Sequence, residues 1–241
     1  MLDLAELPAR LAEVRERIAA ACARAGRPPG DVTLIGVTKT HPAALVEAAW
    51  KAGLRVLGEN RVQEALGKSR ELGALPAPPE GPEWHLIGPL QSNKVRAALD
   101  LFRTVHSIDR PKIAEAVHRE ASARGLRVDG FLEVNVGGEE SKHGFSPDGF
   151  VEAVRPLADF QGPEGLRIVG LMAVPPFGDD AEASRRWFVR LRELGRELAA
   201  RPEWAGFPGL LSMGMSHDYE VAVEEGATHV RVGTALFGTR G

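Results

Sequence analysis

Hydrophobic and polar residues follow two different patterns along the chain. From Leu2 to Ala25, apolar residues recur at steps of three and four, which predicts one amphipathic helix. The segment Gly26–Gly30 holds two glycines and two prolines, and it is expected to end that helix. Beyond it, short and nearly continuous apolar runs alternate with helical stretches. Such runs are typical of parallel strands that are buried on both faces.

Eight of these runs are predicted strands, and each is followed by a helix or a helical turn. The predicted strands are Val32–Lys39, Arg55–Asn60, Trp84–Gly88, Thr104–Asp109, Gly130–Val136, Arg167–Val174, Leu210–Met215 and His229–Thr234. This order predicts an α/β fold, a single (β/α)8 barrel of the TIM type. A doubly wound open sheet is the alternative, with fewer strands and usually a glycine-rich loop after the first. We expect residues 1–241 to form one domain, in which residues 1–30 are an additional N-terminal helix and connector packed on the barrel.

Composition narrows the classes of partner. The 241 residues are 44% hydrophobic and 26% charged, which is ordinary for a soluble globular protein. The net charge is −3 without a long basic run, so neither nucleic acid nor a membrane surface is an expected partner. The N-terminal stretch is acidic where a secretory signal is basic, and no apolar run approaches the roughly 18 residues of a membrane span. The lone cysteine, Cys22, is expected to be a buried thiol. We therefore predict a cytoplasmic protein.

Lys39 is the most informative residue for function. In this kind of barrel, functional residues lie at the carboxyl ends of the strands and in the loops that follow. Lys39 ends the first predicted strand, whereas the other five lysines fall in helical or loop stretches. Apolar neighbours favour the neutral amine, which is the form that reacts with a carbonyl to give a Schiff base. The alternative is a strand-end lysine that reaches solvent or pairs with Glu59.

Two loops near the C-terminus have the features of a phosphate site. The segment Ser212–Ser216 follows the seventh predicted strand, and Gly233 and Thr234 end the eighth. The loops after strands seven and eight form the usual phosphate site of this fold. Ser216 is placed to bind a phosphate, to cap the next helix, or to do both. Gly233 lets the backbone approach an anion closely.

Arg231 lies between these loops, within the eighth predicted strand. Because a buried guanidinium is costly without a partner, two interpretations stand. Arg231 either forms an ion pair with a glutamate or hydrogen-bonds the pyridine nitrogen of pyridoxal 5′-phosphate (PLP). In the second case the arginine keeps that nitrogen unprotonated and weakens the ring as an electron sink. The lysine, the phosphate loops and the arginine together point to PLP as the cofactor. No pair of histidines has the spacing typical of a zinc site, so no metal is expected.

These segments, taken in order, resemble the pyridoxal phosphate homeostasis protein family, whose fold is similar to the barrel domain of alanine racemase. The resemblance runs from about Val32 to Gly238. It rests on Val37–Thr40, Gly58–Glu64, His85–Lys94, Glu133–Asn135, Ser141–Lys142, Gly170–Met172, Leu211–Ser216 and Val230–Thr234. One departure is Arg61, which stands where the family's GEN-x-VQE motif is expected to have a tyrosine or another aromatic residue.

The resemblance implies a set of site residues. Lys39 would carry PLP as a Schiff base, and Arg231 would face the ring nitrogen. The residues that would hold the phosphate are Ser216, Gly233 and Thr234. The residues that would lie near the cofactor are Asn60, His85 and Met213. No residue is assigned a catalytic role.

Catalysis and storage remain alternative functions. A two-base racemase needs a second acid or base opposite Lys39, and racemases of this barrel type take a tyrosine from an added β domain of a partner subunit. The sequence ends at Gly241, so no such domain is expected, and Tyr219 is poorly placed. We therefore expect a carrier or buffer of intracellular PLP, monomeric rather than an obligate oligomer, with apo forms of PLP-dependent enzymes as its recipients. A weak amino-acid racemase is the main alternative, and a barrel enzyme for a phosphorylated metabolite without PLP is another.

Overall fold

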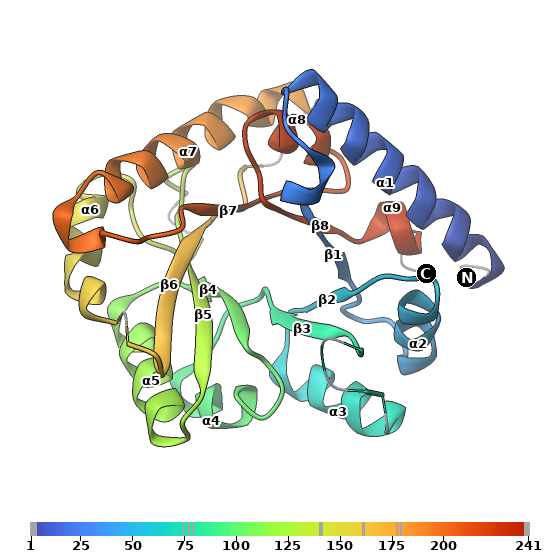
Figure 1. Ribbon diagram of the computed structural model, residues 1–241, viewed down its shortest axis with the longest axis horizontal. Coiled ribbons are helices and arrows are strands. Elements are labelled where there is room, and N and C mark those ends of the chain that lie inside the picture. Colours follow the sequence, from blue (N-terminus) through green and yellow to red (C-terminus); the bar gives the residue numbers. More distant parts are fainter. Residues whose placement is uncertain are drawn as a thin grey trace.

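The computed structural model describes residues 4–73, 75–76, 78, 80–139, 142–160, 162–176, 178 and 180–238. Eight parallel strands close into a barrel in chain order, with helices around it (Figure 1). The strands are β1 (Thr33–Val37), β2 (Val56–Glu59), β3 (Glu83–Leu86), β4 (Thr104–Ile108), β5 (Arg127–Glu133), β6 (Gly165–Met172), β7 (Leu210–Met215) and β8 (His229–Val232). Since β1 pairs with both β2 and β8, the sheet has no edge. The predicted barrel is confirmed, and the open sheet is wrong.

The helices alternate with the strands as predicted. They are α1 (Leu7–Arg24), α2 (Ala43–Lys51), α3 (Val62–Leu72), α4 (Val95–Ala98), α5 (Pro111–Ala123), α6 (Phe150–Val154), α7 (Arg185–Ala199), α8 (Tyr219–Glu224) and α9 (Thr234–Phe237). Short 3-10 turns precede or follow several of them: η1 (Leu4–Glu6), η2 (Pro29–Asp31), η3 (Ser92–Lys94), η4 (Arg155–Asp159), η5 (Glu182–Ser184) and η6 (Pro202–Trp204). In the described part of the chain, none of these helices is long and apolar enough to cross a membrane.

The main hydrophobic core lies between the strands and the surrounding helices. Nearly all residues of the strands are buried or half-buried, and β2 and β4 are buried throughout. Cys22 is fully buried in this core, as expected. The barrel interior is different: a small cluster of Phe131, Val169 and Met172 shares it with buried polar side chains. The strands therefore present one face to the helices and another to a partly polar barrel interior.

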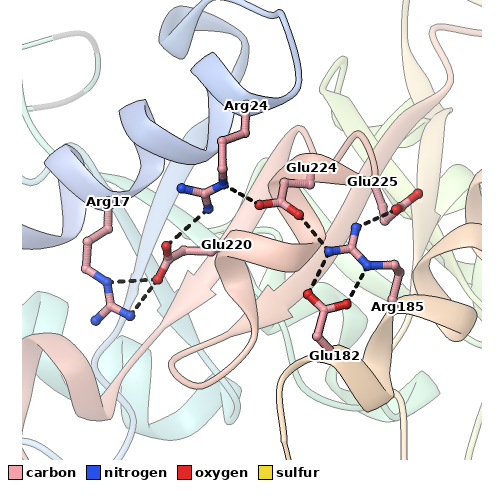
Figure 2. A network of polar contacts seen from close by, with 7 residues as sticks. All are labelled: Arg17, Arg24, Glu182, Arg185, Glu220, Glu224 and Glu225. Carbon is pink, nitrogen blue, oxygen red and sulfur yellow. Dashed lines mark hydrogen bonds and ion pairs between the residues drawn. The ribbon is translucent and has the colours of Figure 1, made fainter.

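Helix α1 packs against α8 and α9, the two helices that follow the loops expected to bind phosphate (Figure 1). A surface network of ion pairs secures the contact between α1 and α8 (Figure 2). Its members are Arg17, Arg24, Glu182, Arg185, Glu220, Glu224 and Glu225. Arg17 lies 2.5 Å from Glu220, and Arg24 lies 2.6 Å from Glu224. Arg185 joins the same network to η5 and α7, so that α1, α7 and α8 are held as one layer.

Candidate functional site

A cavity of about 740 Å³ opens at the carboxyl ends of the strands, largely between β1, β7 and β8. This volume falls in the range of roughly 300–1,000 Å³ that is typical of small-molecule sites. Its lining residues are Val37, Lys39, Asn60, Ile87, Val174, Met215, Ser216, His217, Arg231, Gly233, Thr234 and Ala235. Six of the eight predicted site residues are among them: the lysine, the arginine, both phosphate loops and Asn60. Features that lie as far as 195 positions apart in the sequence therefore meet in one cavity.

The backbone around Lys39 is held in a fixed and unusual conformation. Lys39 is half-buried, and the next residue, Thr40, has φ +66°, a left-handed value that β-branched residues rarely adopt. The carbonyl oxygen of Thr38 accepts a hydrogen bond from Lys68 Nζ at 2.7 Å, and the N–H of Thr40 donates to Glu64. Because both neighbours of Lys39 are tied to α3, its side chain leaves the backbone from a well-defined point. Strain of this kind is often found at functional sites.

Glu59, the residue considered as a pairing partner for Lys39, is engaged by two other groups. Its Oε1 accepts hydrogen bonds from Thr38 Oγ1 at 2.7 Å and from Lys68 Nζ at 2.6 Å. The Glu59 side chain is fully buried, and this burial raises its pKa, while Lys68 and Thr38 act in the opposite direction. The buried group under Lys39 is thus a lysine–carboxylate cluster that belongs to the scaffold.

Arg231 is a buried cation with neutral partners. Its residue is 4% exposed; Nη1 donates to Ser212 Oγ at 2.7 Å, and Nη2 donates to the Ala173 carbonyl oxygen at 2.9 Å. Burial lowers the pKa of Arg231 to about 10, so the guanidinium stays charged at neutral pH. Within the described part of the chain no carboxylate forms an ion pair with it, which removes the glutamate-pair interpretation. A charge left in this state favours a polar or anionic ligand in the cavity.

Ser216 connects the two phosphate-type loops. Its Oγ accepts hydrogen bonds from the backbone N–H groups of Gly233 at 3.1 Å and Ala235 at 3.2 Å. Ser216 does not cap the helix after β7, because that helix begins at Tyr219 and Asp218 occupies the N-cap position. Ser216 therefore does not cap α8; its hydroxyl instead caps the start of α9, where the loops after β7 and β8 converge.

The same convergence of loops offers backbone donors. Among the described residues, no protein acceptor is found for the N–H groups of Ser216 and Thr234. A Cβ built on Gly233 would lie 3.5 Å from Val37 Cβ, which is an ordinary contact. Protein packing therefore does not demand glycine at position 233, whereas close approach of a ligand to this backbone would explain it.

Two predicted residues, His85 and Met213, do not line the cavity. Met213 is fully buried in the main core, because side chains alternate along a strand and its neighbour Ser212 points into the barrel. His85 is 3% exposed and lies inside the barrel, with Nδ1 3.0 Å from Nε2 of His106. Asn60, by contrast, lines the cavity as expected.

The apolar wall of the cavity was not singled out from the sequence. Val174 and Met215 end predicted strands and Ile87 is next to the end of one, so the strand-end rule reaches their positions. Apolar residues are so common at such positions that their type gave no signal. Val174 is 38% exposed, one of two exposed large hydrophobic residues in the described part of the chain, and it marks the rim.

Tyr219 is unavailable to the cavity as an acid or base. Its side chain is 1% exposed, and the guanidinium of Arg17 lies over its ring at 5.5 Å, on the side of α1. Burial raises the pKa of the Tyr219 hydroxyl. The expectation that Tyr219 is poorly placed for racemisation agrees with this position.

The fold and site define a class of protein. The family model described as "Alanine racemase, N-terminal domain" matches residues 9–241. The alanine racemase from Bartonella henselae is 14% identical with a TM-score of 0.69, covering 99% of this chain and 60% of the racemase chain. At that identity the likeness shows the shared barrel fold alone.

More similar relatives identify the family. The "Pyridoxal phosphate homeostasis protein" of Aquifex aeolicus is 43% identical over 96% of this chain and 97% of its own length. The protein of the same name from Pseudomonas aeruginosa is 46% identical over 95% of this chain and 94% of its own length. PipY of Synechococcus elongatus, solved with PLP bound, is 39% identical with a TM-score of 0.78, over 93% of this chain and 100% of PipY. The chain belongs to the pyridoxal phosphate homeostasis protein family.

Proposed function

We propose that this chain binds PLP in the cavity between β1, β7 and β8, through a Schiff base on Lys39, and serves in intracellular PLP homeostasis. The observation that carries the proposal is the meeting of Lys39, the buried cation Arg231 and the converging loops in one cavity of small-molecule size. The PLP-bound structure of PipY, 39% identical to this chain, supports the same cofactor.

The residues of the cavity fit the parts of PLP. Lys39 supplies the amine for the aldehyde, and Arg231 supplies a donor for the ring nitrogen. Ser216, Gly233 and Thr234 supply a hydroxyl and backbone N–H groups for the phosphate. When bound, the cofactor supplies an electron-withdrawing ring, and a guanidinium beside the ring nitrogen limits that property. Asn60 would lie beside the ring. His85, inside the barrel, and Met213, in the main core, would act on the site without lining the cavity.

A carrier or buffer fits better than a catalyst. Lys39 is the one acid or base proposed at the cofactor, and Tyr219 faces α1. A weak amino-acid racemase remains the alternative, and amino-acid turnover lost in Lys39→Ala would support it. In the carrier role, the chain would be a cytoplasmic monomer that acts as one domain, residues 1–241, with residues 1–30 packed on the barrel. Its recipients would be apo forms of PLP-dependent enzymes.

The test is reduction of the protein–PLP complex. The purified protein is mixed with PLP, its visible spectrum is recorded before and after borohydride, and the reduced adduct is mapped by peptide mass. We expect an absorption band of a Schiff base and an adduct on Lys39 that Lys39→Ala abolishes and that Lys112→Ala, on the exposed face of α5, leaves intact. Absence of the band, or an adduct on another lysine, would reject the proposal.

A further inference from the structure

A line of polar contacts crosses the barrel interior. It begins at the Arg231 guanidinium, whose Nη1 is 2.7 Å from Ser212 Oγ. Ser212 Oγ is 2.8 Å from His106 Nδ1, and His106 Nε2 is 3.0 Å from His85 Nδ1. His85 Nε2 is in turn 3.0 Å from Glu83 Oε1, a contact with the distance but not the alignment of a hydrogen bond. Five side chains thus connect end to end.

The line runs from one end of the barrel to the other. Arg231 lines the cavity at the carboxyl ends of the strands, whereas Glu83 is the first residue of β3, at the opposite end. Ser212 and His106 come from β7 and β4, which are not neighbours in the barrel, so they meet inside it. Branched apolar side chains dominate the interior of most barrels of this kind. Three buried polar side chains in a row therefore require a reason.

The chemistry of the two ends fixes the direction of the donors. Arg231 can only donate, and an ionised Glu83 can only accept. With both imidazoles neutral, one arrangement satisfies every contact. In it, His85 directs its Nε2 proton toward Glu83 and accepts at Nδ1 from His106. His106 then accepts at Nδ1 from the Ser212 hydroxyl, which itself accepts from Arg231. Every link donates away from the cavity, so the bond dipoles are aligned and strengthen one another.

The charges along the line agree with this arrangement. The contact with His85 is the main cause that lowers the pKa of Glu83, so this carboxyl is ionised at neutral pH. Burial holds the pKa of His106 well below its usual value. Burial also lowers the pKa of the neighbouring His229 to about 3. Burial thus disfavours a charge on His106 and His229, which lie between a cation at one end of the line and an anion at the other.

We propose that Ser212, His106 and His85 are positioning residues that fix the Arg231 guanidinium at the cavity, and that Glu83 anchors the far end of the line. The assignment of Arg231 to a cofactor ring rests on the proposed function, but the line of contacts does not depend on it. Through this line, His85 is connected with the cofactor site although it does not line the cavity.

The first test examines the line in the protein without added PLP. Nitrogen-15 NMR of the histidine side chains, with signals assigned by substitution, reports which ring nitrogen carries the proton. We expect His85 and His106 both to carry it on Nε2. A proton on Nδ1 of either ring would reverse or break the line and overturn the proposal. This result is independent of whether Lys39 binds PLP.

The second test removes one link and uses a matched control. Ser212→Ala deletes the hydroxyl between Arg231 and His106. Ser107→Ala deletes another buried serine hydroxyl, which donates to the Gly88 carbonyl oxygen outside the line. We expect Ser212→Ala to shift the absorption band of the PLP complex and to weaken PLP binding about tenfold, the lower end of effects known for groups that orient a ligand-binding residue. We expect Ser107→Ala to change neither. Equal behaviour of the two variants would overturn the proposal.

The third test acts at the far end, where folding is least at risk. The Glu83 side chain is 46% exposed, so Glu83→Gln should be tolerated. We expect this variant to move the nitrogen-15 signals of both His85 and His106, and to shift the absorption band of the PLP complex in the same direction as Ser212→Ala. Unchanged signals at both rings would overturn the proposal. If wild-type protein forms no adduct on Lys39, the proposed function fails, while the NMR results still decide the line.

Discussion

Replacement of Lys68 by methionine should destabilise the protein strongly, because Lys68 is the only cation, among the described residues, that contacts the fully buried carboxylate of Glu59. Lys68 Nζ donates to the Thr38 carbonyl oxygen at 2.7 Å, to Glu59 Oε1 at 2.6 Å and to Glu64 Oε1 at 2.7 Å. The side chain of Lys68 is 7% exposed and that of Glu59 is 0% exposed. Methionine keeps the length and apolar stem of the lysine but leaves Glu59 without its charge partner.

The expected loss in free energy of unfolding is about 3–5 kcal/mol, the usual cost of removing one partner of a buried ion pair. For a chain of this size that corresponds to a fall of roughly 6–20 °C in Tm. The loss should depend on pH. Burial already raises the pKa of Glu59 and Lys68 opposes this, so the pKa of Glu59 should be higher still in the variant. A carboxyl with a raised pKa destabilises the fold as pH rises, so the variant's deficit should be smaller at pH 5 than at pH 8.

Urea unfolding at pH 5, 7 and 8, without PLP to avoid linkage to ligand binding, measures this difference. Lys51→Met is the matched control, since the Lys51 side chain is 64% exposed and pairs with Glu47 on the surface of α2. It should change stability by less than about 0.5 kcal/mol. A loss below about 1 kcal/mol for Lys68→Met, or an equal loss at pH 5 and pH 8, would refute the reasoning.

Three further predictions concern other parts of the structure. Ser216→Ala should weaken PLP binding about tenfold or more, since hydrogen bonds to charged groups contribute about 1.5–3 kcal/mol, and equilibrium titration with PLP would detect it. Burial raises the pKa of Glu133 from its usual value to about 7, so the fold loses stability as pH rises from about 4.5 to about 7. Glu133→Gln should therefore raise Tm at pH 8 and leave it unchanged below pH 4.5. Arg185→Ala removes the centre of the network in Figure 2 and should cost about 1 kcal/mol, a loss that 1 M NaCl should largely abolish.

The barrel was predictable because strands that are buried on both faces have continuous apolar runs in the sequence. The first and last residues of the strands were less predictable. The strand predicted over Gly130–Val136 is observed as Arg127–Glu133, three residues earlier. Arg127 and Asp129 made its first half look polar, yet both carry their charges to an ion pair at the surface while the backbone continues the ladder. Charged side chains that pair with each other along the sheet therefore conceal a strand from pattern reasoning.

The site was predictable where position alone decides it. Lys39, Arg231 and Ser216 could be expected to line one cavity, because the carboxyl ends of parallel strands meet at one end of a barrel. His85 was expected near the cofactor and lies inside the barrel instead, because it shares the inward face of β3 with Glu83, two residues earlier. The hydrogen bond between Gly233 N–H and Ser216 Oγ joins residues 17 positions apart, and no local sequence pattern predicts such a contact.

The packing of α1 on α8 and α9 also dictates an order of events during synthesis. Arg17 and its ion-pair partner Glu220 are 203 positions apart in the chain. At about 5–20 residues per second, roughly 10–40 s pass between the emergence of the first and of the second from the ribosome. Throughout that interval the apolar stripe of α1, which includes Leu7, Leu11 and Val14, lacks α8 and α9, the helices it mainly packs against. The first helix to be made is thus among the last to dock, and a nascent chain must keep it from associating with the wrong surface until the barrel has closed.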